Sequence, residues 1–324
     1  MEAAADIRRS RPLLGTFVEI AVAPAPGEDA AIEAAFAAVA MVHRLMSFHE
    51  PDSDVSRLNR DAAAGPVSVH DWTYEVLNIA LNVHRRSGGV FDVTVAPALQ
   101  KLGLLPRVET DRTSPSPFSG RVGVGQAPRN GLAERPHPAL PEAGEGNIHL
   151  LSDNRVRFAH RDVTIDLGGI AKGFAVDRAV EALCRHGIAA GQVNAGGDLS
   201  AFGPRARAVD IRDPRRPEQP MCRIELDNAA LASSAGRFDP MRANAASGSA
   251  VIDPVTALPA QAVLGATVCA PSCVIADALT KIVMNAGEAA APVLEHYGAS
   301  ALFVSARGDL HVTADWKNEV RLAA

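Results

Sequence analysis

The chain has 324 residues, of which 47% are hydrophobic and 21% are charged, and its formal net charge at pH 7 is -5. This composition supplies one large hydrophobic core or two smaller ones, and the scattered Lys and Arg residues argue against a surface that follows a nucleic-acid backbone. No uninterrupted apolar run reaches the roughly 18 residues of a membrane helix, so we expect no transmembrane segment. From the scattered basic residues we expect no nucleic-acid partner.

The N-terminal segment combines several arginines with the apolar stretch 13–17, a combination that resembles an export signal. Glu19 interrupts the apolar run, and no small-residue cleavage site follows it. We therefore expect a cytoplasmic protein, or a periplasmic one if a leader has been trimmed.

The first third of the chain predicts a strand, a helix, a loop and a second helix. Apolar residues dominate the predicted strand over 16–23. Residues 29–45 repeat apolar side chains at helical spacing, with Asp29 available as the N-cap. A second helix is predicted over 73–86, where a serine and two glycines follow its last residue.

The composition changes between about 113 and 147, where prolines and glycines crowd the sequence without a sustained period. Such a segment cannot bury enough apolar surface to order itself. We therefore predict a disordered surface insertion that contributes little to the core and takes no part in the chemistry.

The remainder of the chain predicts a strand-rich mixture with two helices. Strands are expected over 148–151, 155–158, 163–167, 208–212, 222–226, 265–270, 301–305 and 310–313, and helices over 171–186 and 274–284. Because strands and helices do not alternate regularly, this order favours an α+β protein over a doubly wound sheet.

Two glycine turns are candidates for phosphate binding. In the stretch 166–173, a strand runs through Gly168 and Gly169 into a helix, which places free N–H groups and the positive helix end together, and Lys172 adds a full charge. Glycine turns before helices are also common as structural punctuation, so both interpretations stay open. The second turn, 194–198, ends at Asp198, which either holds a ligand hydroxyl or caps the turn.

The order of these motifs resembles the ApbE family, whose members move FMN from FAD onto a protein side chain. The matching stretches span roughly residues 14–284: Leu14-Gly15-Thr16, Met46 to His49, Ser56 to Asn59, Gly88 to Val95, Asp166 to Gly173, Asn194 to Asp198, Ile252-Asp253-Pro254, Thr267-Val268 and Ala276 to Leu279. The resemblance implies one flavin transferase domain over 10–324, with a two-lobed α+β architecture of mixed sheet and helix and a flavin site between the lobes.

The resemblance also implies a set of site residues. Residues expected to bind FAD are Met46, Ser47, Asp92, Lys172, Gly196, Gly197, Asp198, Ser234 and Thr267; those expected to act in catalysis are Asp253 and Lys172; and those expected to hold Mg²⁺ are Gly169 and Asp277. The implied partner is an acceptor protein. Its Ser or Thr hydroxyl attacks the FMN phosphorus, the metal polarises the phosphoryl oxygens, and AMP leaves.

Two departures from the family pattern fall on the same chemical step. Four residues after Asp277, where the family has a threonine, this chain has Lys281, whose ammonium has three donors and no acceptor and cannot ligate magnesium. We expect an exposed ion pair with Asp277, worth tenths of a kcal/mol, with the lysine nitrogen in the cation position. The histidine expected before Ile-Asp-Pro is Ala250, and loss of a general base typically costs about 10²- to 10⁴-fold in rate.

These departures leave two functions open. The chain is either a flavin transferase or a non-catalytic relative that binds FAD. Two carboxylates have alternatives as well: Asp277 is either a metal ligand or a helix-surface acid paired with Lys281, and Asp92 either contacts the ligand or satisfies backbone donors in its own loop.

Overall fold

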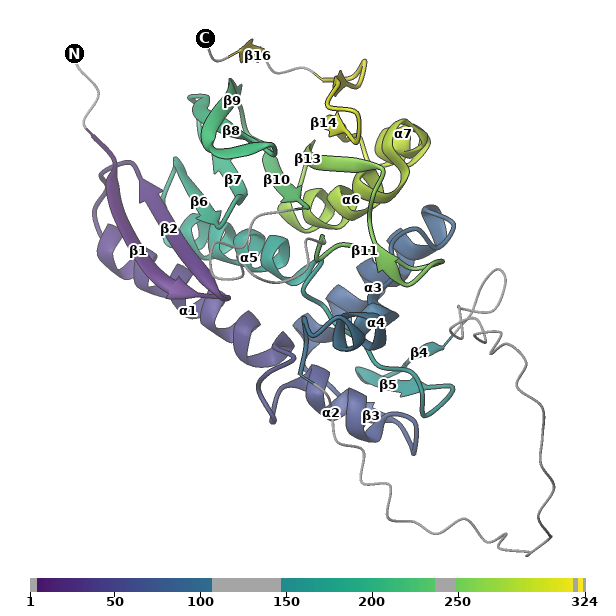
Figure 1. The fold of residues 1–324 in the computed structure, drawn as a ribbon. Helices are drawn as coiled ribbons and strands as arrows, with labels where there is room; N and C mark the ends of the chain where they lie inside the picture. Colours follow the sequence, from purple (N-terminus) through teal and green to yellow (C-terminus); the bar gives the residue numbers. More distant parts are fainter. Residues whose placement is uncertain (1–4, 107–146, 237–248, 317–319, 323–324) are drawn as a thin grey trace, which may run out of the picture.

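The computed structural model describes residues 5–106, 147–236, 249–316 and 320–322 (Figure 1). The insertion predicted over 113–147 lies outside these ranges apart from Asn147. Across the ranges that are described, no helix is both long enough and apolar enough to span a bilayer.

An antiparallel sheet of eight strands forms one side of the molecule (Figure 1). Its strands, in spatial order, are β1 (Ile7–Leu13), β2 (Thr16–Val22), β6 (Gly191–Ala195), β7 (Asp198–Phe202), β10 (Ala230–Ala235), β13 (Val263–Ala270), β14 (Ser300–Ser305) and β15 (Leu310–Val312). The first two strands are joined by Leu14 and Gly15, both with positive φ (55° and 71°). Positive φ at both central residues is typical of a type I′ turn, whose twist matches that of the strands.

Three helices cover one face of this sheet: α1 (Glu28–Met46), α5 (Ala171–Arg185) and α6 (Cys273–Ala286) (Figure 1). On the opposite face lies a three-stranded sheet of β8 (Arg207–Asp213), β9 (Arg216–Leu226) and β16 (Val320–Leu322). Leu199, Leu231 and Leu302 of the large sheet pack there against Ile211 and Ile224 in a second, smaller core. The central strands β7, β10 and β14 are therefore covered on both faces.

The other part of the molecule is built from short elements. These are α2 (Asp54–Asp61), α3 (Asp71–Arg86), a 3₁₀ turn (Val93–Val95), α4 (Ala96–Lys101), the sheet of β3 (Val67–Ser68), β5 (Arg155–Phe158) and β4 (Ile148–Leu151), and the hairpin β11 (Ile252–Asp253) and β12 (Leu258–Pro259). A 3₁₀ turn (Gly287–Ala290) and α7 (Ala291–His296) follow α6. The principal core runs continuously from α1, α5 and α6 into α2 and α3. The mixture of antiparallel sheets and helices confirms the predicted α+β architecture.

The N-terminus of α1 differs from the prediction. Its N-cap is Gly27, in the left-handed region at φ 83°, rather than Asp29. Asp29 lies in the first turn beside Glu28, where negative charge is favourable, and it accepts a hydrogen bond from Arg9 (3.3 Å). The cap therefore comes from backbone geometry and not from a side chain.

The strand predicted over 163–167 is also wrong. Its backbone groups pair with a side chain instead of a neighbouring strand: the Ile165 N–H donates to Asn59 Oδ1 (2.8 Å), and the Ile165 carbonyl accepts from Asn59 Nδ2 (2.9 Å). Asp166 N–H donates to the Val93 carbonyl (2.8 Å). Buried and half-buried residues alternate along the segment, but it belongs to no sheet among the described strands.

The N-termini of α5 and α6 are capped by each other's carboxylates. Asp177 of α5 accepts hydrogen bonds from the N–H groups of Cys273 and Val274 (both 2.8 Å). Asp277 of α6 accepts from the Gly173 N–H (3.0 Å). These reciprocal caps satisfy donors that a helix start leaves unpaired, and they fix the two helices relative to one another.

We expect Gly173→Ala to destabilise the fold by about 3 kcal/mol, because overpacking of a rigid contact is costly. A Cβ at this position would lie 2.2 Å from the Cys273 carbonyl oxygen and 2.8 Å from Asp277 Cβ. Urea denaturation measures the loss. Gly65→Ala is the matched control, because a Cβ there meets nothing within 4 Å. Equal stabilities of the two variants would contradict the close approach of α5 and α6.

Candidate functional site

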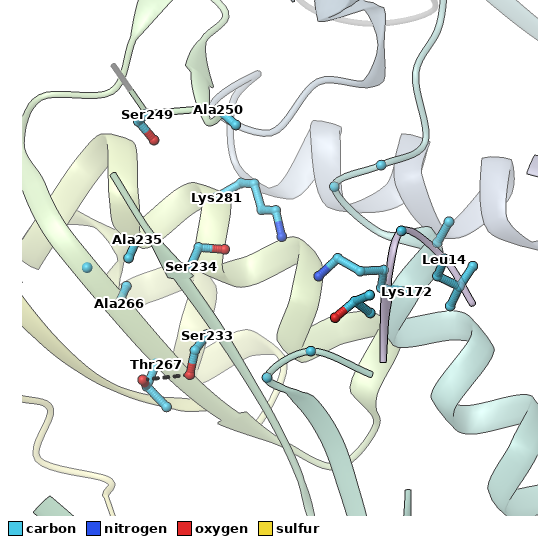
Figure 2. Close-up of a pocket in the computed structure, with 18 of the residues that line it drawn as sticks. Leu14, Lys172, Ser233, Ser234, Ala235, Ser249, Ala250, Ala266, Thr267 and Lys281 are labelled. Carbon is cyan, nitrogen blue, oxygen red and sulfur yellow. Dashed lines mark hydrogen bonds between the residues drawn. The ribbon is translucent and has the colours of Figure 1, made fainter. Parts of the chain in front are cut away.

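A cleft of about 2600 Å³ lies between the large sheet and the part of the molecule that contains α4. Typical small-molecule sites occupy about 300–1000 Å³, so this cleft has room for a dinucleotide. Its walls come from the β1–β2 turn, the end of α1, the loop before α4, both glycine turns, and strands β10 and β13. Figure 2 shows the part around the two lysines.

Both glycine turns line this cleft, as the phosphate-site hypothesis requires: Gly168 and Gly169 before α5, and Gly196 and Gly197 between β6 and β7. Their amides are not all available to a ligand, however. The Gly168 N–H donates to Asp166 (3.2 Å), and the Gly197 N–H donates to Asn194 (2.9 Å). The two bends converge, but charged side chains must supply much of the attraction for a diphosphate.

Lys172, in the first turn of α5, forms an ion pair with Asp198 at the start of β7. Burial lowers the pKa of Lys172, but the carboxylates of Asp198 and Asp277 outweigh it and raise that pKa. Burial and the nearby Asp277 raise the pKa of Asp198 despite the opposing effect of Lys172. The lysine therefore stays charged at the edge of the cleft.

One carboxylate oxygen of Asp198 has no protein donor. Its Oδ2 atom faces Lys172, whereas Oδ1 is buried without a hydrogen-bond partner among the described residues. Only 1% of the residue is exposed. Asp198 does not border the cleft, although Gly197 and Leu199 on either side of it do, so this oxygen is not placed to meet a ligand there. The carboxylate instead holds Lys172.

Asp277 is fully buried and has donors on both oxygens. Gly173 occupies Oδ2, and Lys281, one helical turn further on, occupies Oδ1. Burial raises the pKa of Asp277, but Lys281 and Lys172 together bring it below its ordinary value. The side chains are 0% and 16% exposed, so the exposed, weak pair expected from the sequence is wrong: removal of one partner of a buried pair costs about 3–5 kcal/mol.

The arrangement does not fit a magnesium ion. Lys281 is paired with Asp277 and lies near Gly169, where an added Cβ would come within 3.4 Å of Lys281 Cε. The hydroxyl of Thr280 is engaged elsewhere, with the Asp277 carbonyl (2.7 Å) and Ser234 (2.8 Å). In the described ranges, no group of three or more His, Cys, Asp or Glu side chains is placed to hold a metal.

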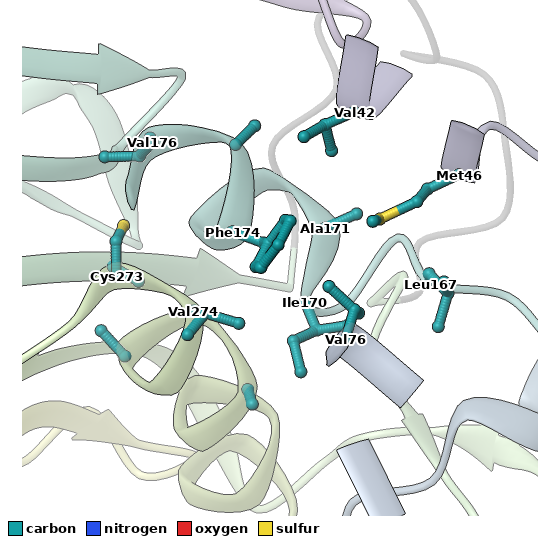
Figure 3. Packing of buried hydrophobic residues seen from close by; sticks show 14 of the residues in the cluster. Val42, Met46, Val76, Leu167, Ile170, Ala171, Phe174, Val176, Cys273 and Val274 are labelled. Carbon is teal, nitrogen blue, oxygen red and sulfur yellow. The ribbon is translucent and has the colours of Figure 1, made fainter. Parts of the chain in front are cut away.

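Three other predicted ligand residues lie at the cleft near the end of α1 and in the loop before α4. Met46 is 4% exposed and packs mainly within the core (Figure 3). Ser47 follows α1, and its hydroxyl accepts from the His49 N–H (3.2 Å). Asp92 accepts from the N–H and hydroxyl of Thr94 (2.8 and 2.9 Å), so it satisfies donors of its own loop while it also borders the cleft.

Ser234 and Thr267 border the cleft from β10 and β13. Ser234 shares a hydrogen bond with Thr280 (2.8 Å), and Thr267 shares one with Ser233 (2.9 Å, Figure 2). Each hydroxyl therefore already has one protein partner and retains capacity for a ligand.

The structure places Asp253 in the β11–β12 hairpin. Its carboxylate accepts from the Val255 N–H (2.9 Å) and the Thr256 hydroxyl (3.0 Å), and thus organises the turn. Ser249, Ala250, Ile252 and Pro259 of this segment border the cleft, and Asp253 does not. Its carboxylate is therefore not brought together with the other predicted site residues.

Sequence reasoning missed an apolar part of the cleft wall. Phe17 on β2 is 70% exposed and Leu102 after α4 is 42% exposed, and both border the cleft. Large exposed apolar side chains in a cleft suit a planar aromatic ligand. The available signal was the alternation along β2, where Val18 and Ile20 are buried and Phe17 faces outward.

Comparisons with known proteins identify relatives of this chain. A model of the ApbE family matches residues 14–312. An FAD:protein FMN transferase of Treponema pallidum is 28% identical over 98% of this chain and 89% of its own, and one of Vibrio cholerae is 28% identical over 76% and 70%. The crystal structure of the ApbE protein of Thermotoga maritima aligns with a TM-score of 0.78 at 27% identity, covering 95% of this chain and 97% of that one.

Proposed function

The chain belongs to the ApbE family, and from this membership we propose that it transfers FMN from FAD to a Ser or Thr of an acceptor protein and releases AMP. The relatives reported above are FAD:protein FMN transferases. The observation that carries the proposal is one cleft in which two glycine turns and Lys172, which is paired with the buried Asp198, come together.

In the proposed reaction the acceptor hydroxyl oxygen bonds to the FMN phosphorus, and the bond from that phosphorus to the AMP oxygen breaks. AMP leaves with the electron pair, and the hydroxyl proton passes to solvent. Lys172 and Lys281 border the cleft and offset negative charge on the diphosphate. Such positioned charges supply most of the catalysis in phosphoryl transfer.

Magnesium, which the family resemblance implies, is not part of this proposal. Both oxygens of Asp277 already have donors, and Lys281 contacts the Gly169 region. The chemistry proposed for this chain is therefore assigned to its own cations.

A second candidate is an FAD-binding protein without transferase activity. It is favoured by Ala250, which is exposed at the cleft where the family places a histidine. A methyl group cannot accept the proton of the acceptor hydroxyl, so this chain has lost a general base at that position.

The test is an FAD titration followed by an assay for AMP. If the chain is a transferase, FAD with a Ser/Thr-containing peptide library yields AMP and a flavin-labelled peptide, and a library without Ser and Thr yields neither. Yellow protein that releases FAD unchanged favours the second candidate. Absence of flavin binding overturns both candidates. Binding is also detectable as a gain in stability, because FAD at about 100 times its dissociation constant should stabilise the fold by roughly 2.7 kcal/mol.

A further inference from the structure

We propose that the ammonium group of Lys281 is a built-in replacement for a divalent cation, so that this protein binds the diphosphate of a flavin dinucleotide without metal. The proposal rests on the proposed function for the identity of the ligand. It does not require that transfer occur.

Lys281 is held at the position that a cation would otherwise occupy. Its Nζ atom donates to the Asp277 carboxylate and to the Asp277 backbone carbonyl (3.0 Å). Its aliphatic stem lies against Gly169. The ammonium is thus fixed beside the oxygens that would otherwise attract a cation, and only 16% of the side chain is exposed.

The Lys281 ammonium has a hydrogen-bond donor left for a ligand. A lysine has three N–H donors, and two of those of Lys281 are used within α6. Figure 2 shows the amino groups of Lys281 and Lys172 directed toward the same part of the cleft. The remaining donors suit phosphate oxygens, which accept strong charge-assisted hydrogen bonds.

The Lys281 ammonium is covalently tethered close to the Asp277 carboxylate. Lys281 is on the same helix as Asp277, four residues away, so its effective concentration at the carboxylate far exceeds that of a free ion. An incoming Mg²⁺ would have to displace this ammonium from Asp277 and meet the repulsion of Lys172. We therefore expect the tethered cation to prevail.

The charges of the two lysines at the cleft and of their two aspartate partners determine how strongly the site can activate a diphosphate. Lys172 and Lys281 are matched by Asp198 and Asp277, so the four groups sum to zero. With a divalent ion in place of Lys281, the same cluster would carry one more positive charge. The diphosphate therefore meets a weaker field, and its phosphorus is less activated, than in a metal-loaded site.

The first experiment uses the unaltered full chain. Flavin fluorescence titrations with FAD are run in excess EDTA and in excess Mg²⁺, and Mn²⁺ binding is followed by EPR. The expected results are equal FAD affinities in the two buffers and no bound Mn²⁺. Binding that is about tenfold or more tighter with Mg²⁺ would overturn the inference and leave the proposed function standing. Absence of FAD binding in both buffers would overturn both.

The second experiment changes the cation. In Lys281→Thr, which provides a neutral oxygen ligand, we expect FAD affinity to become about tenfold or more tighter with Mg²⁺ than with EDTA, and Mn²⁺ to bind. Lys281→Met should weaken FAD binding in EDTA, since it removes the charge, and should recover less with Mg²⁺ than Lys281→Thr does, since it adds no oxygen ligand. Lys101→Met, at the exposed end of α4, is the matched control and should resemble the unaltered chain. A Lys281→Thr variant indifferent to Mg²⁺ would contradict the proposal.

Discussion

Replacement of Lys172 by methionine is expected to weaken FAD binding by about 100-fold. Lys172 supplies a charge-assisted contact to the diphosphate, and hydrogen bonds to charged groups contribute about 1.5–3 kcal/mol, which corresponds to roughly 10- to 150-fold in affinity. It lies at the convergence of the two glycine turns and pairs with a carboxylate that is 1% exposed. Isothermal titration calorimetry measures the loss.

The same substitution also leaves Asp198 buried without its cation, which costs about 3–5 kcal/mol of stability. A double variant, Lys172→Met with Asp198→Asn, removes that charge and should recover most of the stability. Its FAD affinity should remain low, because the Lys172 ammonium no longer faces the diphosphate. If the double variant bound FAD as tightly as the unaltered chain, Lys172 would be a structural residue and not a ligand for phosphate.

Introduction of histidine at position 250 is expected to raise the rate of FMN transfer by about 10²- to 10⁴-fold, the usual contribution of a general base. Ala250 is exposed and borders the cleft, so an imidazole there meets no core packing and is available to a hydroxyl that enters the cleft. The measurement is the rate of AMP release from FAD with a Ser/Thr peptide library.

Two comparisons interpret the result of Ala250→His. Ala250→Gln places a side chain of similar reach that cannot accept a proton in this way, and it should leave the rate unchanged. FAD affinity should be the same in all three proteins, because position 250 contributes to proton transfer and not to binding. A rate that histidine does not raise would mean that another step limits transfer, and it would favour the non-catalytic candidate.

Sequence patterns predicted those elements whose periodicity is strong. The helices around Phe36 and Phe174 and the hairpin of β4 and β5 appear where the spacing places them. Elements with weak patterns were missed. β1 carries three arginines and was interpreted as part of a leader-like stretch, whereas α2 is polar throughout apart from Val55 and Leu58.

The site was predictable in outline and not in its contacts. Glycine turns that precede a helix or a strand indicated where backbone approaches a ligand, and Gly169 and Gly196 do border the same cleft. Burial is a property of the folded chain, so no local pattern could show that the Asp277–Lys281 pair is enclosed. The turn formed by Asp253 likewise depends on a hydrogen-bond geometry that composition does not specify.

The reciprocal caps of α5 and α6 limit the ways in which this cleft can change during evolution. Asp277 holds the start of α5 whatever else occupies the cleft, so its negative charge cannot be discarded without loosening two helices at once. A descendant that dispensed with an external ion would still need a countercharge within the same turn. A lysine one turn along α6 provides that countercharge within the chain itself. The fold can then be kept without a bound metal ion.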